Sequence, residues 1–148
     1  MIEEFVKAWD ANKGVLETYF HTHEQKQYSS YRNIVRQLFR CVINTYLLQE
    51  GKDCYDVAVT AGKDDPVREI DDGEYNGTLL FILHKDVYNP AVKDYVITSV
   101  EYGSCSGCDT LQGIHKYSED FPDKEQVKDY MKLALHLLQR CHFLVESL

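Results

Sequence analysis

The sequence has few of the residues that mark disordered, fibrous or membrane-spanning chains. Its 148 residues include eight glycines and three prolines, fewer than disordered or collagen-like chains contain. No apolar run approaches the roughly 18 residues that a bilayer-spanning helix needs. The first 22 residues are acidic and unlike a secretory signal. With 44% hydrophobic residues, the sequence predicts one soluble globular domain over residues 1–148 and no membrane partner.

Basic residues are also scarce. The chain has 16 lysines and arginines against 24 aspartates and glutamates, a formal net charge of -8. Proteins that bind duplex DNA draw much of their affinity from lysine and arginine contacts with phosphate, so direct duplex-DNA binding is not expected. The excess of acidic over basic residues is concentrated in residues 53–101, which contain eleven acidic and four basic residues.

Cysteine use favours a reducing compartment. Five cysteines, an odd number at irregular spacing, occur in a chain without an export signal, which predicts free thiols and a cytoplasmic location. A chain of this length buries roughly two thirds of the surface that its unfolded form exposes. It therefore needs neither a disulfide nor a metal to fold, and no cofactor is expected. The cysteines are Cys41, Cys54, Cys105, Cys108 and Cys141.

Three segments have apolar residues at the three-and-four spacing of amphipathic helices. The first covers residues 2–20. The second runs from Ser29 to about Gln49, with a serine available as N-cap and Gly51 just past the end. The third begins at Asp123, has Gln126 at the third helical position as in a capping box, and continues its apolar stripe to Val145.

Between the second and third helices the pattern changes to that of strands. Tyr55–Ala61, Thr78–His84 and Tyr95–Tyr102 are rich in β-branched and aromatic residues. The turn residues between the second and third of these segments predict a hairpin with a long connection. The expected fold is α+β, a small antiparallel sheet of about three strands packed with three main α-helices in a single domain.

The most acidic stretch, residues 64–74, is called the acidic segment here. Its turn formers and its lack of apolar periodicity predict a loop. Asp71, Asp72 and Glu74 are candidates for binding a basic partner surface or a divalent cation. The spacing excludes an EF-hand, because Arg68 and Ile70 would fall on ligand positions. The alternative is a solvated loop without a binding role.

Arg32, Arg36 and Arg40 stand four residues apart on the second helix and are called the arginine row. The spacing places the three side chains on one helix face. In an acidic protein such a row is a candidate for gripping phosphate or carboxylate, since a guanidinium group binds either one bidentately. The alternative is that the arginines pair with the protein's own acidic segment or are solvated.

The third strand runs into a glycine- and serine-rich turn, residues 103–113. Ser104, Ser106, Gly107 and Asp109 are candidates for binding an anion or a partner, because a strand that turns sharply into a helix exposes several backbone N–H groups together. Asp109 or Thr110 can also cap the short helix that follows.

The same turn contains a Cys-x-x-Cys pair, Cys105 and Cys108. Two thiols at this spacing supply half of a tetrahedral zinc site or cycle through a disulfide. Nothing in the spacing selects the remaining zinc ligands, and the context lacks the long helix of a thioredoxin motif. A structural loop is the third interpretation. The residues considered for completing a zinc site are His115, Cys54, and Cys141 with His142.

No nucleophile elbow, Walker loop, dinucleotide fingerprint or His-Glu-x-x-His motif occurs in the sequence. No class of enzyme therefore has positive support, and the catalytic residues of any activity are unknown. A non-enzymatic binding protein is the first hypothesis, and a zinc-binding or thiol-redox protein centred on the Cys-x-x-Cys turn is the second.

One string also resembles a known group of proteins. Tyr102–Gln112, YGSCSGCDTLQ, is preceded by Asn76–Leu80 and followed by Gln126–Met131 and Leu135–Gln139. Together these segments resemble small uncharacterised proteins of tailed bacteriophages, over roughly residues 28 to 145. The resemblance implies a setting in the bacterial host cytoplasm and an accessory role on a host or phage protein, such as inhibition of host machinery or defence. It implies no role for any individual residue.

Overall fold

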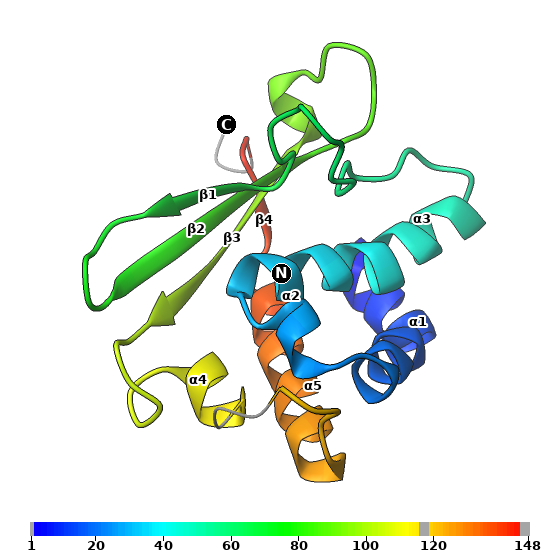
Figure 1. Cartoon of the computed structure of the whole chain (residues 1–148). Coiled ribbons are helices and arrows are strands. Elements are labelled where there is room, and N and C mark those ends of the chain that lie inside the picture. The colour runs from blue at the N-terminus through cyan, green and yellow to red at the C-terminus, as the bar shows by residue number, and fades with distance from the viewer. Residues whose placement is uncertain (1, 116–118, 146–148) are drawn as a thin grey trace.

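Helices precede and follow an antiparallel sheet along the chain, which confirms the α+β class (Figure 1). The structure is a computed structural model that describes residues 2–115 and 119–145. The described elements are α1 (Glu3–Thr22), η1 (Gln25–Tyr28), α2 (Tyr31–Leu38), η2 (Phe39–Ile43), α3 (Asn44–Gln49), β1 (Arg68–Asp71), β2 (Gly77–His84), η3 (Val92–Asp94), β3 (Tyr95–Tyr102), α4 (Thr110–His115), α5 (Lys124–Gln139) and β4 (His142–Phe143).

The second predicted helix is continuous from Tyr31 to Gln49 as α2, η2 and α3. Ser30 is its N-cap, and its hydroxyl accepts a hydrogen bond from the backbone N–H of Asn33 at 3.2 Å. The η2 stretch is a π-helix, a local widening that hydrophobic periodicity does not predict. Gly51 follows the helix with φ of 69°, a conformation that favours glycine.

The predicted capping box of α5 is confirmed. Asp123 accepts from the backbone N–H of Gln126 at 2.8 Å, and the Gln126 side chain accepts from the N–H of Asp123 at 2.9 Å. The helix ends at Gln139 and not near Val145, so the prediction was wrong about its length. The chain then turns so that β4 pairs with β3, and the buried Cys141 lies in this turn.

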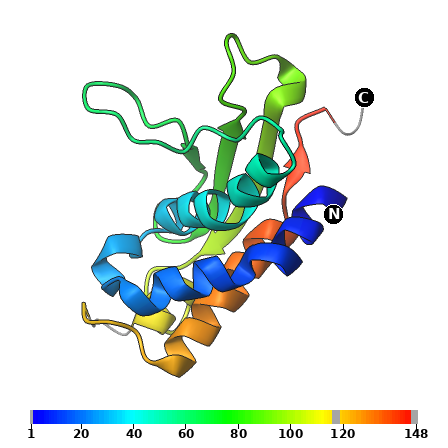
Figure 2. The same ribbon diagram turned by 90° about the vertical axis from the view of Figure 1, so that its right-hand side faces the viewer.

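The sheet has four strands in the order β1-β2-β3-β4, and all neighbours are antiparallel. The predicted hairpin of β2 and β3 is confirmed, with η3 inside its connection. Alternate residues of β2 and β3 face the helices, which lie on one side of the sheet (Figure 2). Thr98 joins the layers, because its hydroxyl donates to the backbone carbonyl of Leu137 in α5 at 2.6 Å.

The first strand lies elsewhere than predicted. In the segment predicted as a strand, Tyr55–Ala61, Tyr55 makes only an isolated bridge with Lys85. Strand β1 forms instead inside the acidic segment, where a loop was expected, and all four of its residues are exposed. Pairing with β2 supplies the stability that the local sequence of β1 lacks, because a strand is held mainly by its neighbours.

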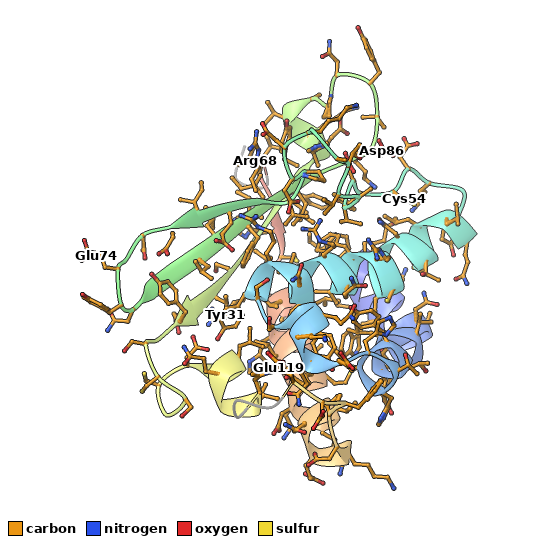
Figure 3. All side chains as sticks on the ribbon, in the orientation of Figure 1. Tyr31, Cys54, Arg68, Glu74, Asp86 and Glu119 are labelled. Carbon is orange, nitrogen blue, oxygen red and sulfur yellow. The ribbon has the colours of Figure 1, made fainter. Side chains whose placement is uncertain are left out.

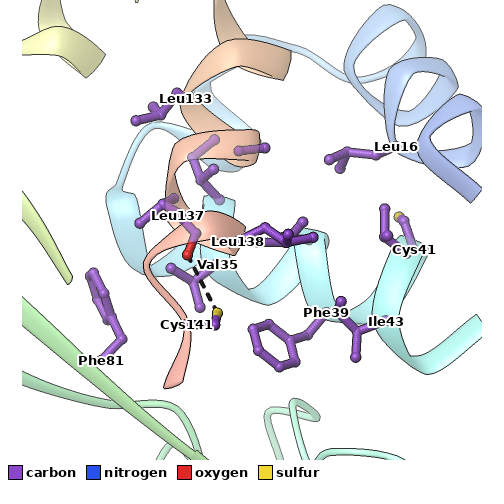
Figure 4. Close-up of a cluster of buried hydrophobic side chains, with 14 of the residues drawn as sticks. Leu16, Val35, Phe39, Cys41, Ile43, Phe81, Leu133, Leu137, Leu138 and Cys141 are labelled. Carbon is purple, nitrogen blue, oxygen red and sulfur yellow. Dashed lines mark hydrogen bonds between the residues drawn. The ribbon is translucent and has the colours of Figure 1, made fainter. Parts of the chain in front are cut away.

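The core lies between the sheet and the three long helices (Figure 4). Leu16 from α1, Leu138 from α5 and Phe81 from β2 are buried there. Phe5 meets Phe39 edge to face, with ring centroids 5.7 Å apart, an arrangement that adds to the burial of both rings. None of the helices in the described ranges is both long and apolar enough to span a bilayer.

Candidate functional site

A cleft of about 320 Å³ opens where the start of α2, the ends of β1 and β3, and the turn after β3 meet. It brings together two features that lie far apart in the sequence, the acidic segment and the glycine- and serine-rich turn. Tyr31, labelled in Figure 3, stands at its wall. The other lining residues are Ser29, Ser30, Glu69, Asp71, Leu79, Tyr102, Gly103, Asp109, Leu111 and Gln112.

Asp109 holds the turn against α2. Its carboxylate accepts hydrogen bonds from the Tyr31 hydroxyl at 3.0 Å, the backbone N–H of Gln112 at 2.9 Å and the backbone N–H of Gly103 at 3.0 Å. The bond from Gln112 confirms Asp109 as the N-cap of α4. The Tyr31 hydroxyl in turn accepts from the N–H of Leu111 at 3.1 Å, and burial raises the pKa of Tyr31.

Of the four candidates in the turn, Asp109 is taken up by this network, which also occupies the backbone N–H groups of Gly103 and Gln112. The N–H groups of Gly103 and Gln112 point at the carboxylate of Asp109, which is itself buried. An added Cβ at Gly103 would lie 2.4 Å from the backbone oxygen of Cys108, so the turn is closely packed there. Ser104, Ser106 and Gly107 are exposed on its outer side.

Two members of the arginine row bind the protein's own acidic segment. Arg36 is buried, and its guanidinium donates to Asp65 at 2.5 Å and to the backbone carbonyl of Val57 at 2.7 Å. Arg32 lies 3.6 Å from the carboxylate of Asp65 and 3.8 Å from that of Glu69. Burial alone would raise the pKa of Asp65, but the hydrogen bonds and the positive charge of Arg36 lower it on balance.

Arg40 does not join this cluster. It is exposed on the π-helical stretch and forms no ion pair with any residue in the ranges that the structure describes. The row therefore divides into two residues that anchor the acidic segment to α2 and one that faces solvent. An external phosphate would have to displace Asp65 to reach Arg36.

The other acidic candidates lie at the end of β1 and in the turn to β2. The Tyr102 hydroxyl donates to Asp71; this bond lowers the pKa of Asp71 and raises that of Tyr102 to about 12. Asp72 accepts from the backbone N–H of Thr78 at 2.6 Å. Glu74 lies at the tip of the turn, far from the helices (Figure 3). All three carboxylates are exposed, but Asp71 and Asp72 accept hydrogen bonds from this hairpin and its neighbour strand, whereas Glu74 bonds to no side chain or backbone group of the described residues.

The two cysteines of the turn are exposed free thiols. The sulfur of Cys108 accepts a hydrogen bond from the backbone N–H of Cys105 at 3.0 Å. Hydrogen bonds from the Cys105 thiol, and then from the backbone N–H groups of Cys105 and Ser104, lower the pKa of Cys108. Cys141 differs, since full burial raises its pKa to about 12. Cys108 is therefore the thiol suited to reaction.

The residues considered as further zinc ligands do not gather around this pair. Cys54 donates to the backbone carbonyl of Asn44 at 3.5 Å, and Cys141 donates to that of Leu137 at 3.4 Å. Within residues 2–115 and 119–145, no three histidine, cysteine, aspartate or glutamate side chains are grouped as a metal site requires. The described residues thus supply two sulfur ligands, half of a structural zinc site.

A second surface escaped the sequence analysis. Lys124, Lys128 and Lys132, called the lysine row, stand four residues apart on α5 and edge a groove of about 560 Å³ between α1 and α5. The spacing is the same as that of the arginine row, so the signal is present in the sequence. The groove forms only because α1, more than 100 residues away, packs beside α5 (Figure 2).

Comparison with known proteins adds no relative: neither a family model, nor a curated protein, nor a solved structure matches this chain.

Proposed function

We propose that the chain is a non-enzymatic binding protein that recognises a host or phage protein through its acidic hairpin, defined as β1, the turn 72–76 and β2. The observation that carries the proposal is the exposed edge strand β1 beside the acidic turn. Ile70 is 51% exposed and Tyr75 is 76% exposed on this hairpin. Exposed apolar groups beside charged ones are typical of contact surfaces.

The free edge of β1 offers backbone groups as well. The N–H of Asp72 donates to Thr78 at 3.3 Å, and residues that bond across an antiparallel pair alternate along the strand. The backbone groups of Arg68 and Ile70 therefore point toward β2, as those of Asp72 do. The N–H and C=O groups of Glu69 and Asp71 point away from β2, where an added strand would bind them.

The chemistry of this surface favours an extended basic segment as the partner. A strand added beside β1 would run past Asp71 and Asp72 toward Glu74, and lysines or arginines on it would meet these carboxylates. The turn that carries these carboxylates is tight, because an added Cβ at Gly73 would lie 1.9 Å from the backbone oxygen of Asn76. Only glycine allows the two ends of the turn to approach so closely.

The resemblance to small phage proteins supports a setting for this interaction. In it, the chain is a cytoplasmic accessory protein in a bacterial host, and its partner is part of the host or phage machinery. The low content of basic residues supports a protein partner over duplex DNA. The same surface carries no constellation of nucleophile, base and oxyanion donors that would support catalysis.

The test captures partners from bacterial lysate with the purified protein and then compares hairpin variants. Glu69→Pro removes an N–H that points away from β2 and so blocks strand addition without taking a bond from the sheet. Glu69→Ala is the matched control, since it removes the same carboxylate, and with it the contact to Arg32, but keeps the N–H. Glu74→Lys reverses the exposed acidic charge at the tip of the turn.

We expect wild type to capture a stoichiometric partner, Glu69→Ala to retain it, and Glu69→Pro and Glu74→Lys to lose it. Added salt should weaken capture, because the contact is exposed and charged. Equal capture by all four proteins, or the absence of any stoichiometric partner, would exclude the hairpin as the binding surface. Circular dichroism checks that each variant is folded.

A second candidate function rests on the lowered pKa and exposure of Cys108 beside Cys105. We propose it as a zinc-binding or thiol-redox role of the turn. In the redox form a small-molecule disulfide accepts two electrons and two protons from the two thiols, which join as Cys105–Cys108. Metal analysis and thiol titration of freshly purified protein separate the forms: one zinc per chain supports the first, and two rapidly titrated exposed thiols that are lost on oxidation support the second.

A further inference from the structure

The groove between α1 and α5 combines an apolar floor with a cationic edge. Trp9 from α1 and Val127, Met131 and Leu135 from α5 provide the apolar surface. Trp9 and Val127 are largely buried, whereas Met131 and Leu135 are half-buried and reach the open side. Methionine adapts its shape to different contacts, which suits a surface that must meet a partner.

The charge of this groove is opposite to that of the protein. Lys13 on α1 and the lysine row on α5 give four cations, against one carboxylate, Glu17, which lies 3.9 Å from His21. The side-chain ammonium groups of Lys13, Lys124 and Lys132 form no ion pair or hydrogen bond with any residue whose position is described. Lys128 contacts Glu125 at 3.4 Å, an exposed pair of little strength.

The dimensions of the groove match those of a helix. Its residues on α5 run from Lys124 to Leu135 and those on α1 from Trp9 to His21, which at 1.5 Å per residue is about 16 to 18 Å, or three helical turns. On both walls they recur every four positions. Side chains at this spacing form ridges along a helix, and a third helix packs its own ridges between them.

We propose that this groove binds an amphipathic helix of a partner protein, with apolar residues on one face and aspartates or glutamates beside them. The apolar face would cover Met131 and Leu135, and the acidic residues would meet Lys13 and the lysine row. Helix-in-groove binding of this kind uses anchors three, four and seven residues apart. An oligonucleotide would meet the lysines but leave the apolar floor without a complementary surface.

The proposal is independent of the acidic hairpin, which lies on β1 and β2 and would bind a basic extended segment. The two surfaces carry opposite charge and select opposite partners. Loss of binding at one surface therefore leaves the other intact, and the variants designed for the hairpin do not change any residue of the groove.

Trp9 allows a direct test, because it is the only tryptophan of the chain and it lines the groove. The probe is a tryptophan-free synthetic peptide of about 14 residues, long enough for three to four turns, with leucines at helical spacing and glutamates beside them. A peptide of the same composition in scrambled order, and a thymidine oligonucleotide, are titrated in parallel. Trp9 fluorescence and amide chemical shifts report occupancy.

Two variants and one control connect binding to the named residues. The first variant reverses the charge of the lysine row and is Lys124→Glu/Lys128→Glu/Lys132→Glu. The second, Met131→Glu, places a negative charge on the apolar floor of the groove. Lys7→Glu/Lys63→Glu/Lys93→Glu makes the same change in net charge at exposed lysines outside the groove. Light scattering of wild type and Met131→Glu reports whether a second copy of the chain fills the groove.

We expect the ordered peptide to quench or shift Trp9 emission in a saturable way and to change chemical shifts along α1 and α5. Either groove variant should raise the Kd of the peptide about tenfold or more, and the control should leave it unchanged. Equal binding of the scrambled peptide, or unchanged affinity in both groove variants, would overturn the proposal. So would binding of the oligonucleotide in place of the peptide, or a wild-type dimer that Met131→Glu dissociates.

Discussion

Two rows of cations with the same spacing meet opposite environments in this protein. The arginine row lies on the long middle helix, where the acidic segment folds over it, and Arg36 is buried against Asp65. The lysine row lies on α5, where its side chains extend into solvent at the edge of a groove. Arg32 and Arg36, which are neutralised within the chain, stabilise the fold, whereas the lysines have no buried partner and are available to another molecule.

The chemistry of the two side chains agrees with this difference. The guanidinium of Arg36 donates to a carboxylate and to a backbone carbonyl at once, which its planar arrangement of donors permits. Lysine has a flexible stem that covers apolar surface while its charge stays in water. The lysine row accordingly flanks the apolar floor of the groove while its charges stay exposed.

The largest expected effect comes from removing the acidic partner of the arginine row. Asp65→Asn leaves the Arg36 guanidinium buried without a counter-charge. We expect the free energy of unfolding to fall by about 3 kcal/mol, the low end for a broken buried pair because Asp65 is partly exposed. Urea denaturation measures the change. Asp64→Asn, at an exposed position that pairs with exposed Arg68, is the control, and an equal loss there would refute the assignment.

Acid should weaken the ion pairs of the arginine row and leave the lysine row unchanged. The expected loss of stability is smaller than that of Asp65→Asn, because Asp65 is only partly protonated in the pH range where the protein stays folded. The pKa of Asp65 is lowered in the folded chain, so its contribution to stability is complete above the ordinary aspartate value of about 3.9 and is lost as the pH falls through the lower folded value. We expect the stability difference between wild type and Asp65→Asn to stay constant from neutral pH to about pH 5 and to shrink below about pH 4.

Denaturation of both proteins across this range measures the difference directly. Every other carboxylate titrates in both proteins, so the loss of stability that they cause is the same in both and cancels in the difference between the two free energies of unfolding. A difference that stays constant while the proteins remain folded in acid would show that Asp65 does not carry the interaction.

The smallest effect is expected from the lysine row. Replacing Lys124, Lys128 or Lys132 singly by alanine should change the free energy of unfolding by no more than about 0.5 kcal/mol, as for other exposed residues without a buried partner. Thermal or urea denaturation of the three variants checks this. A loss above about 1 kcal/mol in any of them would mean that the row supports the fold, and the contrast with the arginine row would no longer hold.

Much of the local structure was predictable because its causes are local. The capping box of Asp123 and Gln126, the serine cap of α2 and the positions of β2 and β3 each depend on residue types within a few positions. Asp109 as the cap of α4 belongs with them. These features were predicted correctly from residue type and spacing.

Other features depend on contacts between distant residues and were missed. Tyr55–Ala61 has the composition of a strand, but the backbone carbonyl of Val57 accepts from Arg36 and the segment does not pair beyond Tyr55. Strand β1 has unfavourable residues and forms because β2 offers it an edge. The candidate Asp109 is buried and accepts hydrogen bonds from Gly103, Gln112 and Tyr31, the last of which lies 78 positions earlier in the chain.

The amino-acid sequence alone determined where most helices begin, which residues share a helix face, and that acidic charge accumulates in the middle of the chain. It did so because periodicity, capping and composition act over a few residues. The tertiary structure decided which charged faces are covered and which stay open, since a carboxylate reaches Arg36 and α1 flanks the lysine row only after segments far apart in the chain have packed together.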